Sequence, residues 1–206
     1  MKVLLINGSP HEHGCTYTAL SEVEKTLLEN GIETRLAWIG KKPIPGCISC
    51  GKCAGRSRCV LEDGITNGLI EEMEQSDGLI IGSPVYYASA NGSLISLLDR
   101  MFYAGSCFAH KPAAAVTSAR RAGTTATLDE LNKYFTISQM PIISSSYWPM
   151  VHGNTPQEVA QDLEGLQTMR NLGRNMAWLL NCIAAGKEKG LSLPENERTC
   201  RTNFIR

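Results

Sequence analysis

Short strand-like stretches alternate along the chain with segments in which apolar residues recur at helical spacing. The strand-like stretches lie at residues 3–6, 33–39, 78–81, 113–117 and 141–144. The helical spacing appears at residues 16–30, 63–73, 94–101, 128–135 and 155–185. Short uninterrupted apolar runs are typical of strands buried on both faces of a parallel sheet, whereas a one-sided apolar stripe is typical of a helix that covers such a sheet.

The alternation predicts an α/β fold with a doubly wound, five-stranded parallel sheet and right-handed crossovers. The expected strand order is the flavodoxin-like 2-1-3-4-5, in which a ligand binds beyond the carboxyl ends of the strands, between the first and the third. Residues 40–62 show no period and are expected to form a cysteine-rich insertion loop. We expect one domain at residues 1–186 that includes this loop, and a C-terminal tail at residues 187–206.

The first strand ends abruptly in Asn7-Gly8-Ser9-Pro10, before a helical pattern begins at Thr16. Backbone N–H groups converge at such a turn, where the helix dipole is positive, and they favour a phosphate. The turn matches neither a P-loop nor G-x-G-x-x-G, which indicates a phosphate-bearing cofactor other than a Walker-type nucleotide. Polar turns also follow the third and fourth strands, at Gly82-Ser83-Pro84 and residues 118–125. The alternative is a plain strand-to-helix turn with a hydroxyl cap.

Composition narrows the classes of function. The 206 residues, 43% of them hydrophobic, suffice for one sizeable core, and 20 basic residues balance 20 acidic ones. This balance favours neither nucleic acid nor an anionic membrane as a partner. No apolar run approaches the length of a membrane span or of a signal-peptide core, so we expect a cytoplasmic protein.

Four of the eight cysteines crowd into one short segment, at Cys47, Cys50, Cys53 and Cys59. A reducing cytoplasm disfavours disulfides as their explanation. Structural zinc usually takes two well-separated Cys-x2-Cys pairs, whereas three closely spaced cysteines with a fourth nearby suit a [4Fe–4S] cluster. The spacing therefore favours an iron–sulfur cluster, with a metal-free loop and a zinc site as the alternatives.

Two motifs carry a resemblance to a known family. Ile6-Asn7-Gly8-Ser9-Pro10 with Gly14 and Thr16, followed by residues 82–87 (Gly-Ser-Pro-Val-Tyr-Tyr), resembles the NADPH-dependent FMN reductase branch of the flavodoxin-like superfamily. The four clustered cysteines are similar to those of the iron-sulfur flavoproteins within that branch. The resemblance extends from residue 2 to about residue 185.

The resemblance implies FMN bound without covalent attachment by three segments of the chain. The implied contact positions are Ser9, His11, Cys15, Thr16, Pro84, Val85, Tyr86, Tyr87, Ser118, Arg120, Gly123 and Thr124. The first segment would hold the ribityl phosphate, the second would lie along the isoalloxazine ring, and the third would close the other edge. The family's usual arginine and asparagine are His11 and Cys15 here, so backbone N–H groups and hydroxyls would carry more of the phosphate binding.

For several of these residues a structural role is the alternative. Tyr86 and Tyr87 are either flavin-lining or ordinary packing aromatics, and Arg120 with Arg121 is either a flavin or phosphate contact or a solvated pair. Trp148 either walls a substrate pocket or covers the core. No side chain is predicted as a catalytic acid or base, because the protein would chiefly orient nicotinamide and flavin.

The predicted function is FMN-dependent electron transfer from NAD(P)H, or from a reduced carrier, to a small acceptor such as free flavin or a quinone. The alternative is an iron-sulfur flavoprotein that acts as a non-enzymatic electron carrier or redox sensor with a ferredoxin-like partner. A phosphate-ligand binding module without flavin is a third possibility. By resemblance we expect a homodimer or homotetramer. Residues 203–206 are apolar in their middle, so our hypothesis is that this tail end docks on a neighbouring subunit.

Overall fold

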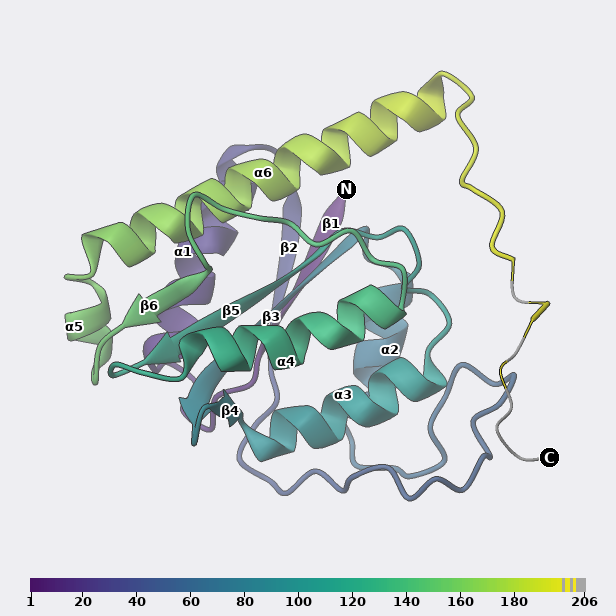
Figure 1. The fold of residues 1–206 in the computed structure, drawn as a ribbon, viewed down its shortest axis with the longest axis horizontal. Helices are drawn as coiled ribbons and strands as arrows, with labels where there is room; N and C mark the ends of the chain where they lie inside the picture. Colours follow the sequence, from purple (N-terminus) through teal and green to yellow (C-terminus); the bar gives the residue numbers. More distant parts are fainter. Residues whose placement is uncertain (198, 201, 203–206) are drawn as a thin grey trace.

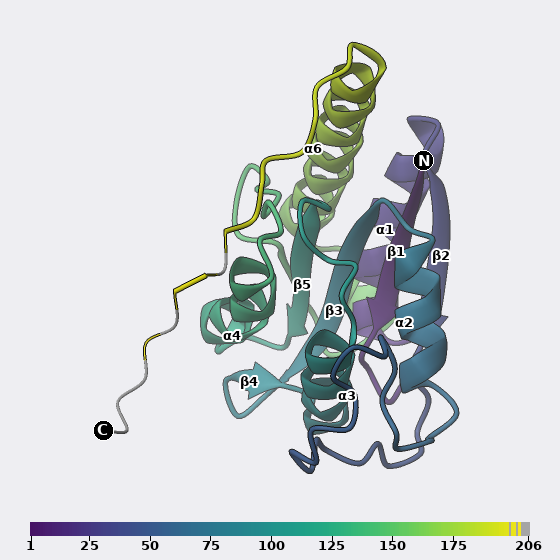
Figure 2. The same cartoon turned by 90° about the vertical axis from the view of Figure 1, so that its right-hand side faces the viewer.

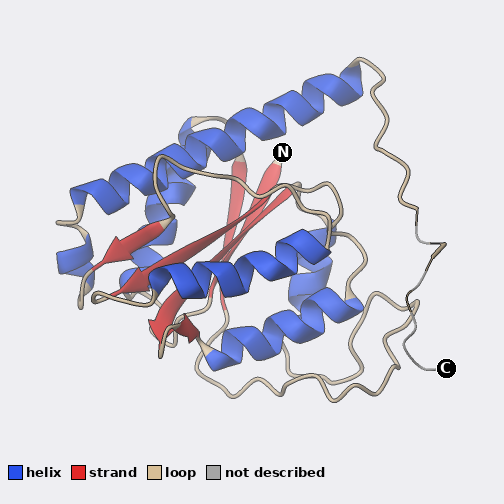
Figure 3. Ribbon diagram, viewed as in Figure 1, coloured by secondary structure: helices blue, strands red, loops and turns tan. Residues whose placement is uncertain are grey.

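A parallel sheet with helices on both faces organises the molecule, as the computed structural model shows for residues 1–197, 199–200 and 202 (Figure 1). The strands are β1 Lys2–Asn7, β2 Glu33–Trp38, β3 Gly78–Tyr86, β4 Ser89–Ala90, β5 Ala113–Ala119 and β6 Met150–His152. The helices are α1 Cys15–Glu29, α2 Thr66–Glu74, α3 Gly92–Ala104, α4 Thr124–Ile137, α5 Pro156–Val159 and α6 Leu163–Glu188. Between β2 and α2 the chain runs as a long loop past α3 (Figure 3).

The sheet order is β2-β1-β3-β5-β6, with all four neighbouring pairs parallel. Counting only these five strands, the order is 2-1-3-4-5, so the predicted topology is confirmed. The short β4 is an unpredicted addition that pairs antiparallel with the end of β3.

Alternate side chains of the strands feed two separate cores. On β1, Leu4 and Ile6 join a cluster with α2, α3 and α4, whereas Val3 and Leu5 join a cluster with α1 and α6. The two views of the ribbon show this three-layer arrangement (Figures 1 and 2). The strand is apolar throughout because both of its faces are covered.

The predicted fifth strand at residues 141–144 is wrong; the fifth parallel strand is β6. Ile142 makes only an isolated bridge to Ala113, and the chain then leaves the sheet until Met150 pairs with Thr117. Between these points α6 supplies the partners, since Asn175 Nδ2 donates to the Ser144 carbonyl at 2.9 Å. A helix side chain thus satisfies backbone that a strand partner would otherwise have satisfied.

The Gly82-Ser83-Pro84 segment lies inside β3 and is not the loop that the sequence predicts. Ser83 and Pro84 still pair with Thr117 and Ser118 on β5. The strand then reverses through Tyr87 and Ala88, whose φ angles of 53° and 59° are left-handed. Two left-handed positions suit the twist of a two-residue hairpin, although side chains other than glycine bear a steric cost there.

The predicted single C-terminal helix is interrupted after Val159. The predicted Thr155 cap is confirmed, because its hydroxyl accepts from the Glu158 N–H at 3.2 Å. Asp162 then starts α6 by accepting from the Gly165 N–H at 2.9 Å, and it also accepts from the His152 N–H of β6 at 2.7 Å. One carboxylate therefore caps a helix and holds the edge strand.

The helix α6 continues two residues beyond the predicted domain boundary, to Glu188. The predicted docking segment at residues 203–206 lies outside the described residues. Within the described part of the chain, no helix combines the length and apolar character needed to cross a membrane.

Candidate functional site

The turn between β1 and α1 packs tightly against β3. The Gly8 N–H donates to the Gly82 carbonyl at 2.8 Å, and a Cβ on Gly8 would lie 2.6 Å from a Leu94 methyl group. Asn7 Oδ1 accepts from the Ser9 N–H at 3.1 Å, which holds the turn from within. Only glycine fits at position 8, because the turn after β1 approaches the backbone of β3 at Gly82 and the side chain of Leu94.

The start of α1 has no side-chain cap. Gly14 occupies the N-cap position, and no side chain accepts from the first turn of the helix. Adjacent to this helix start is a cavity of about 440 Å³. It is lined by His11, Glu12, His13, Gly14, Cys15, Lys41, Asn154, Thr155 and Pro156. Uncapped N–H groups, the positive end of the dipole and a lysine make this cavity suitable for a phosphate.

The structure divides the four predicted phosphate positions into two pairs. His11 and Cys15 line the cavity, whereas Ser9 and Thr16 are only 3% and 1% exposed and do not line it. Ser9 Oγ accepts from the His11 N–H at 3.1 Å. Thr16 Oγ1 lies 2.9 Å from Ser118 Oγ, so the first and third predicted segments are joined by a buried hydroxyl pair.

Cys15 is held beside the cavity with its Sγ 3.7 Å from the Gly153 carbonyl. Burial raises the pKa of this thiol, which keeps it protonated at neutral pH. Cys15 therefore adds no negative charge to the cavity, and Glu12 is the acidic side chain on its wall.

The turn after β5 packs on the hairpin between β3 and β4. Gly123 has φ 95°, and a Cβ at this position would lie 2.9 Å from both Ala88 Cα and Val85 Cγ1. On the other side of the hairpin, the Glu130 carboxylate accepts from the Ser89 hydroxyl and the Ala90 N–H at 2.7–3.0 Å. The second and third predicted segments are thus in direct contact.

The remaining predicted flavin positions differ in their exposure. Tyr87 is fully exposed, Tyr86 is nearly half exposed, and Arg120 is exposed. Thr124 is buried, and its hydroxyl lies 3.1 Å from Met150 Sδ. Tyr86, Tyr87 and Arg120 are therefore available to a ligand, whereas Thr124 has a structural role.

The four clustered cysteines line one small cavity together with Arg100. Cys47 and Cys50 are exposed, whereas Cys53 and Cys59 are half-buried and pack against the core. Among the described residues, no group of three His, Cys, Asp or Glu side chains is arranged to hold a single metal ion. The donor chemistry is that of four thiols facing a shared space.

Arg100 is an almost fully buried cation beside these cysteines, at 1% exposure. Its Nε donates to Cys59 Sγ at 3.3 Å, its Nη1 to the Pro45 carbonyl at 3.2 Å and to Asp63 Oδ2 at 2.5 Å, and its Nη2 to the Leu61 carbonyl. One guanidinium on α3 therefore joins both ends of the cysteine loop.

Sequence reasoning missed Lys41, Glu130 and Arg100. Lys41 lies in a segment without period, so nothing in the pattern placed it near α1. Glu130 was indistinguishable from an ordinary exposed helix residue. Arg100 carried a usable signal, because it occupies the inward face of α3, three residues after the buried Leu97. A lone charge in an apolar stripe indicates a buried partner.

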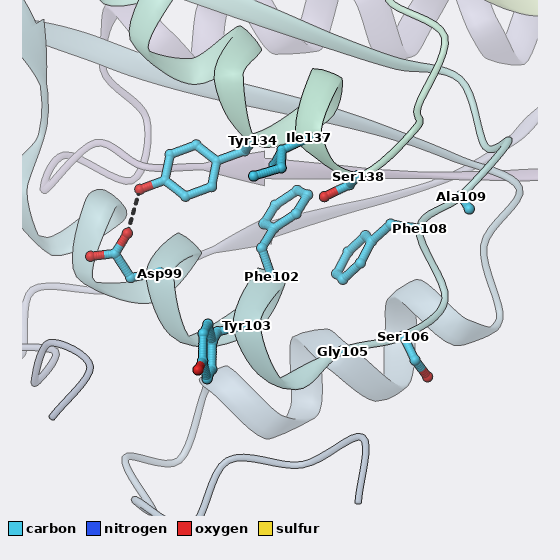
Figure 4. Close-up of a pocket in the computed structure, with 10 residues that line it drawn as sticks. All are labelled: Asp99, Phe102, Tyr103, Gly105, Ser106, Phe108, Ala109, Tyr134, Ile137 and Ser138. Carbon is cyan, nitrogen blue, oxygen red and sulfur yellow. Dashed lines mark hydrogen bonds between the residues drawn. The ribbon is translucent and has the colours of Figure 1, made fainter. Parts of the chain in front are cut away.

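A further cavity, of about 460 Å³, lies between α3 and α4 (Figure 4), and none of the predicted flavin positions lines it. The Tyr134 hydroxyl donates to Asp99 Oδ1 at 2.6 Å across it. Burial and this hydrogen bond raise the pKa of Tyr134 above its ordinary value. Tyr103 lines this cavity and also the cysteine cavity.

Comparison with known proteins agrees with the geometry. The sequence profile described as NADPH-dependent FMN reductase matches residues 1–155. An iron-sulfur flavoprotein of Methanocaldococcus jannaschii is 31% identical over 193 residues, which cover 89% of this chain and 99% of that protein. One of Methanosarcina thermophila is 26% identical over 195 residues, which cover 92% and 100%.

Among solved structures, a flavodoxin from the domain Archaea superposes with a TM-score of 0.61 at 11% identity, over 88% of this chain and 99% of that chain. This similarity confirms the flavodoxin-like fold. Since the family profile covers most of the sequence and the relatives match nearly end to end, the chain belongs to the NADPH-dependent FMN reductase family.

Proposed function

We propose that the protein is an FMN-dependent oxidoreductase. The observation that carries the proposal is the joining of three segments at the carboxyl ends of β1, β3 and β5. The bonds from Gly8 to Gly82 and from Thr16 to Ser118 tie the first segment to the other two. Gly123 packs against Ala88 and ties the second to the third. Such a strand-end site, beside the point where the order reverses, is where flavodoxin-like sheets bind ligands.

The residues present fit the phosphate end of FMN. The uncapped start of α1 offers free backbone N–H donors, and the adjoining cavity has His11, His13 and Lys41 on its wall. Lys41 supplies a positive charge on this wall, as a point charge in place of a bidentate guanidinium fork. Ser9 and Thr16 would act by holding the loop, because their hydroxyls are engaged within the protein.

The residues after β3 and β5 fit the ring end. Pro84, Val85 and Tyr86 are partly exposed at the end of β3, and Tyr87 projects from the strained turn. When bound, FMN would supply hydride and single-electron chemistry. The chain would orient the ring between these residues and the β5–α4 turn, and NAD(P)H and a small acceptor would use the exposed side in turn.

The four thiols support a second proposed role, that of an iron-sulfur flavoprotein. Cys47, Cys50, Cys53 and Cys59 would hold a [4Fe–4S] cluster, for which thiolate ligands are the usual donors. The names of the two archaeal relatives agree with this assignment. In this role the protein would exchange single electrons with a ferredoxin-like carrier and would assemble as a homodimer or homotetramer.

The visible spectrum of protein purified without oxygen, with its iron and acid-labile sulfide content, tests both cofactors. We expect resolved flavin bands in the blue and near ultraviolet, and a broad shoulder that bleaches on reduction if the cluster is bound. Multiple-turnover oxidation of NADPH or NADH with added quinone or free FMN is expected of the oxidoreductase.

The outcomes separate the alternatives. Flavin bands without turnover would favour the electron carrier over the oxidoreductase. Colourless protein that takes up no added FMN would contradict the flavin proposal as a whole. Flavin bands with neither iron nor sulfide would agree with the oxidoreductase proposal and contradict the cluster proposal.

A further inference from the structure

Cys59 is held from two sides, unlike the other three clustered cysteines. Its N–H donates to Asn67 Oδ1 at 2.9 Å, and its carbonyl accepts from Asn67 Nδ2 at 3.0 Å. Its Sγ accepts from Arg100 Nε at 3.3 Å. Asn67 is buried on α2 and Arg100 is buried on α3, so both backbone and sulfur are fixed by regular elements.

The other cysteines rely on local contacts. The Sγ of Cys47 lies 3.5 Å from the N–H of Ser49, within the same turn. Around Cys53, the turn is closed by a backbone bond from Arg56 to the Cys53 carbonyl at 3.0 Å. Among the described contacts, no hydrogen bond from outside the loop reaches either sulfur, although Cys53 packs against the core. Cys59 is therefore the clustered cysteine whose sulfur is fixed by a hydrogen bond from a helix.

The hydrogen bond from Arg100 to the Cys59 sulfur is stronger when that sulfur is a thiolate. A neutral thiol is a weak acceptor, whereas a thiolate is a strong one. A buried guanidinium requires acceptors for its N–H groups, and the other described contacts leave Nε to Cys59 alone. Hydrogen bonds and positive charge at cluster sulfurs favour the reduced state, which carries one more negative charge.

We propose that Arg100 positions the Cys59 sulfur for an iron–sulfur cluster and raises the reduction potential of that cluster. The inference rests on the cluster proposed above. Arg100 also donates to the carbonyls of Pro45 and Leu61 at the two ends of the cysteine loop. Its loss would therefore loosen this loop as well as remove the hydrogen-bond donor to Cys59.

The test replaces the donor but keeps the charge. The variant Arg100→Lys removes the guanidinium Nε–H that donates to Cys59 Sγ but keeps a positive charge opposite Asp63. The matched control is Arg58→Lys, because Arg58 is exposed and lies one residue from Cys59. We expect the midpoint potential of the cluster, measured by spectroelectrochemical titration, to become more negative in Arg100→Lys and to stay at the wild-type value in Arg58→Lys.

A second variant tests the same inference in case Arg100→Lys does not fold. Arg100→Met with Asp63→Asn removes both buried charges together, which avoids leaving either unpaired. We expect a lower potential or loss of iron with native circular dichroism and a cooperative thermal transition. In the cluster-free protein, hydrogen exchange at residues 45–63 should become faster in this variant than in the wild type.

Wild-type potentials in both Arg100 variants would overturn the inference while leaving the cluster intact. If Arg100→Lys does not fold, the double variant decides by the same criterion. Wild-type protein that holds neither iron nor sulfide would instead contradict the cluster itself, so the two failures are distinguishable.

Discussion

Lys41 changes how the phosphate end of the site is understood at the scale of single residues. His11 stands where the family commonly has an arginine, so the turn lacks the bidentate fork of a guanidinium. The structure brings Lys41, three residues after the end of β2, to the same cavity. A charge lost within the turn is thus supplied from a different segment, as a point charge and not as a bidentate fork.

Replacing Lys41 with glutamine should weaken FMN binding about tenfold, roughly 1.4 kcal/mol, because one charged contact to phosphate is lost. The neighbouring Lys42→Gln is the control, since Lys42 is exposed and does not line the cavity. Flavin fluorescence quenching measures both dissociation constants. Equal affinity in the two variants would place the phosphate elsewhere. Riboflavin, which lacks the phosphate, should bind both variants equally.

At the scale of elements, the contact between the β5–α4 turn and the β3–β4 hairpin shapes the ring end of the site. Both partners have left-handed backbone, at Gly123 and at Tyr87 and Ala88. Each such non-glycine residue costs about 1 kcal/mol or more, and this strain persists because neighbouring contacts hold the turn. Glu130, which binds Ser89 and Ala90, provides such contacts.

Gly123→Ala should destabilise the protein more than Gly31→Ala and should also weaken FMN binding. Both positions have positive φ, but nothing lies within 4 Å of a Cβ on Gly31, whereas Ala88 and Val85 lie 2.9 Å from one on Gly123. Gly31→Ala therefore reports the backbone cost alone, about 1 kcal/mol. Urea unfolding measures the difference. An equal loss of unfolding free energy in the two variants would show that the β3–β4 hairpin moves away from the added methyl group without cost.

The elements that the sequence predicted well are those whose pattern is read locally. The apolar runs of β1, β3 and β5 and the stripe of α3 identify these elements as strands and a helix. The sequence did not predict β6, because its three residues, Met150–His152, are too few to show a strand pattern. For the site, the turn at Gly8 was visible in the sequence, whereas the inward orientation of Ser9 and Thr16 depends on contacts with distant residues.

At the scale of the whole molecule, the Arg100–Asp63 pair links the cysteine loop to the layer of α2 and α3. The Asp63 side chain is only 6% exposed and also accepts from the Ile65 and Thr66 N–H groups at 3.0 and 2.8 Å. Burial alone would raise the pKa of Asp63, but the hydrogen bonds from Thr66 and Ile65 and the charge of Arg100 outweigh it and lower the pKa.

Asp63→Asn should cost about 3 kcal/mol at pH 7, because Arg100 is left buried without a counter-charge. The stabilisation from Asp63 is fully present above its unfolded pKa of about 3.9 and is lost as pH falls through the lower folded value. The gap between wild type and variant should therefore close only in strong acid. Urea unfolding of cluster-free protein at pH 7 and pH 2 measures it.

Glu62→Gln serves as the control for Asp63→Asn, since Glu62 is exposed and forms its ion pair with Arg58 at the surface. We expect it to leave the free energy of unfolding nearly unchanged at both pH values. A gap between wild type and Asp63→Asn that stays constant from pH 7 to pH 2 would show that the carboxylate charge is not what stabilises the pair.

The hydrogen bonds of Arg100 to Pro45, Leu61 and Asp63 reduce the conformational entropy of the cysteine loop. Closing a loop of this length costs roughly 3 kcal/mol. The contacts of the guanidinium close this loop without involving a ligand on the thiols. A group that binds the cysteines would therefore have only the short interior of the loop left to order.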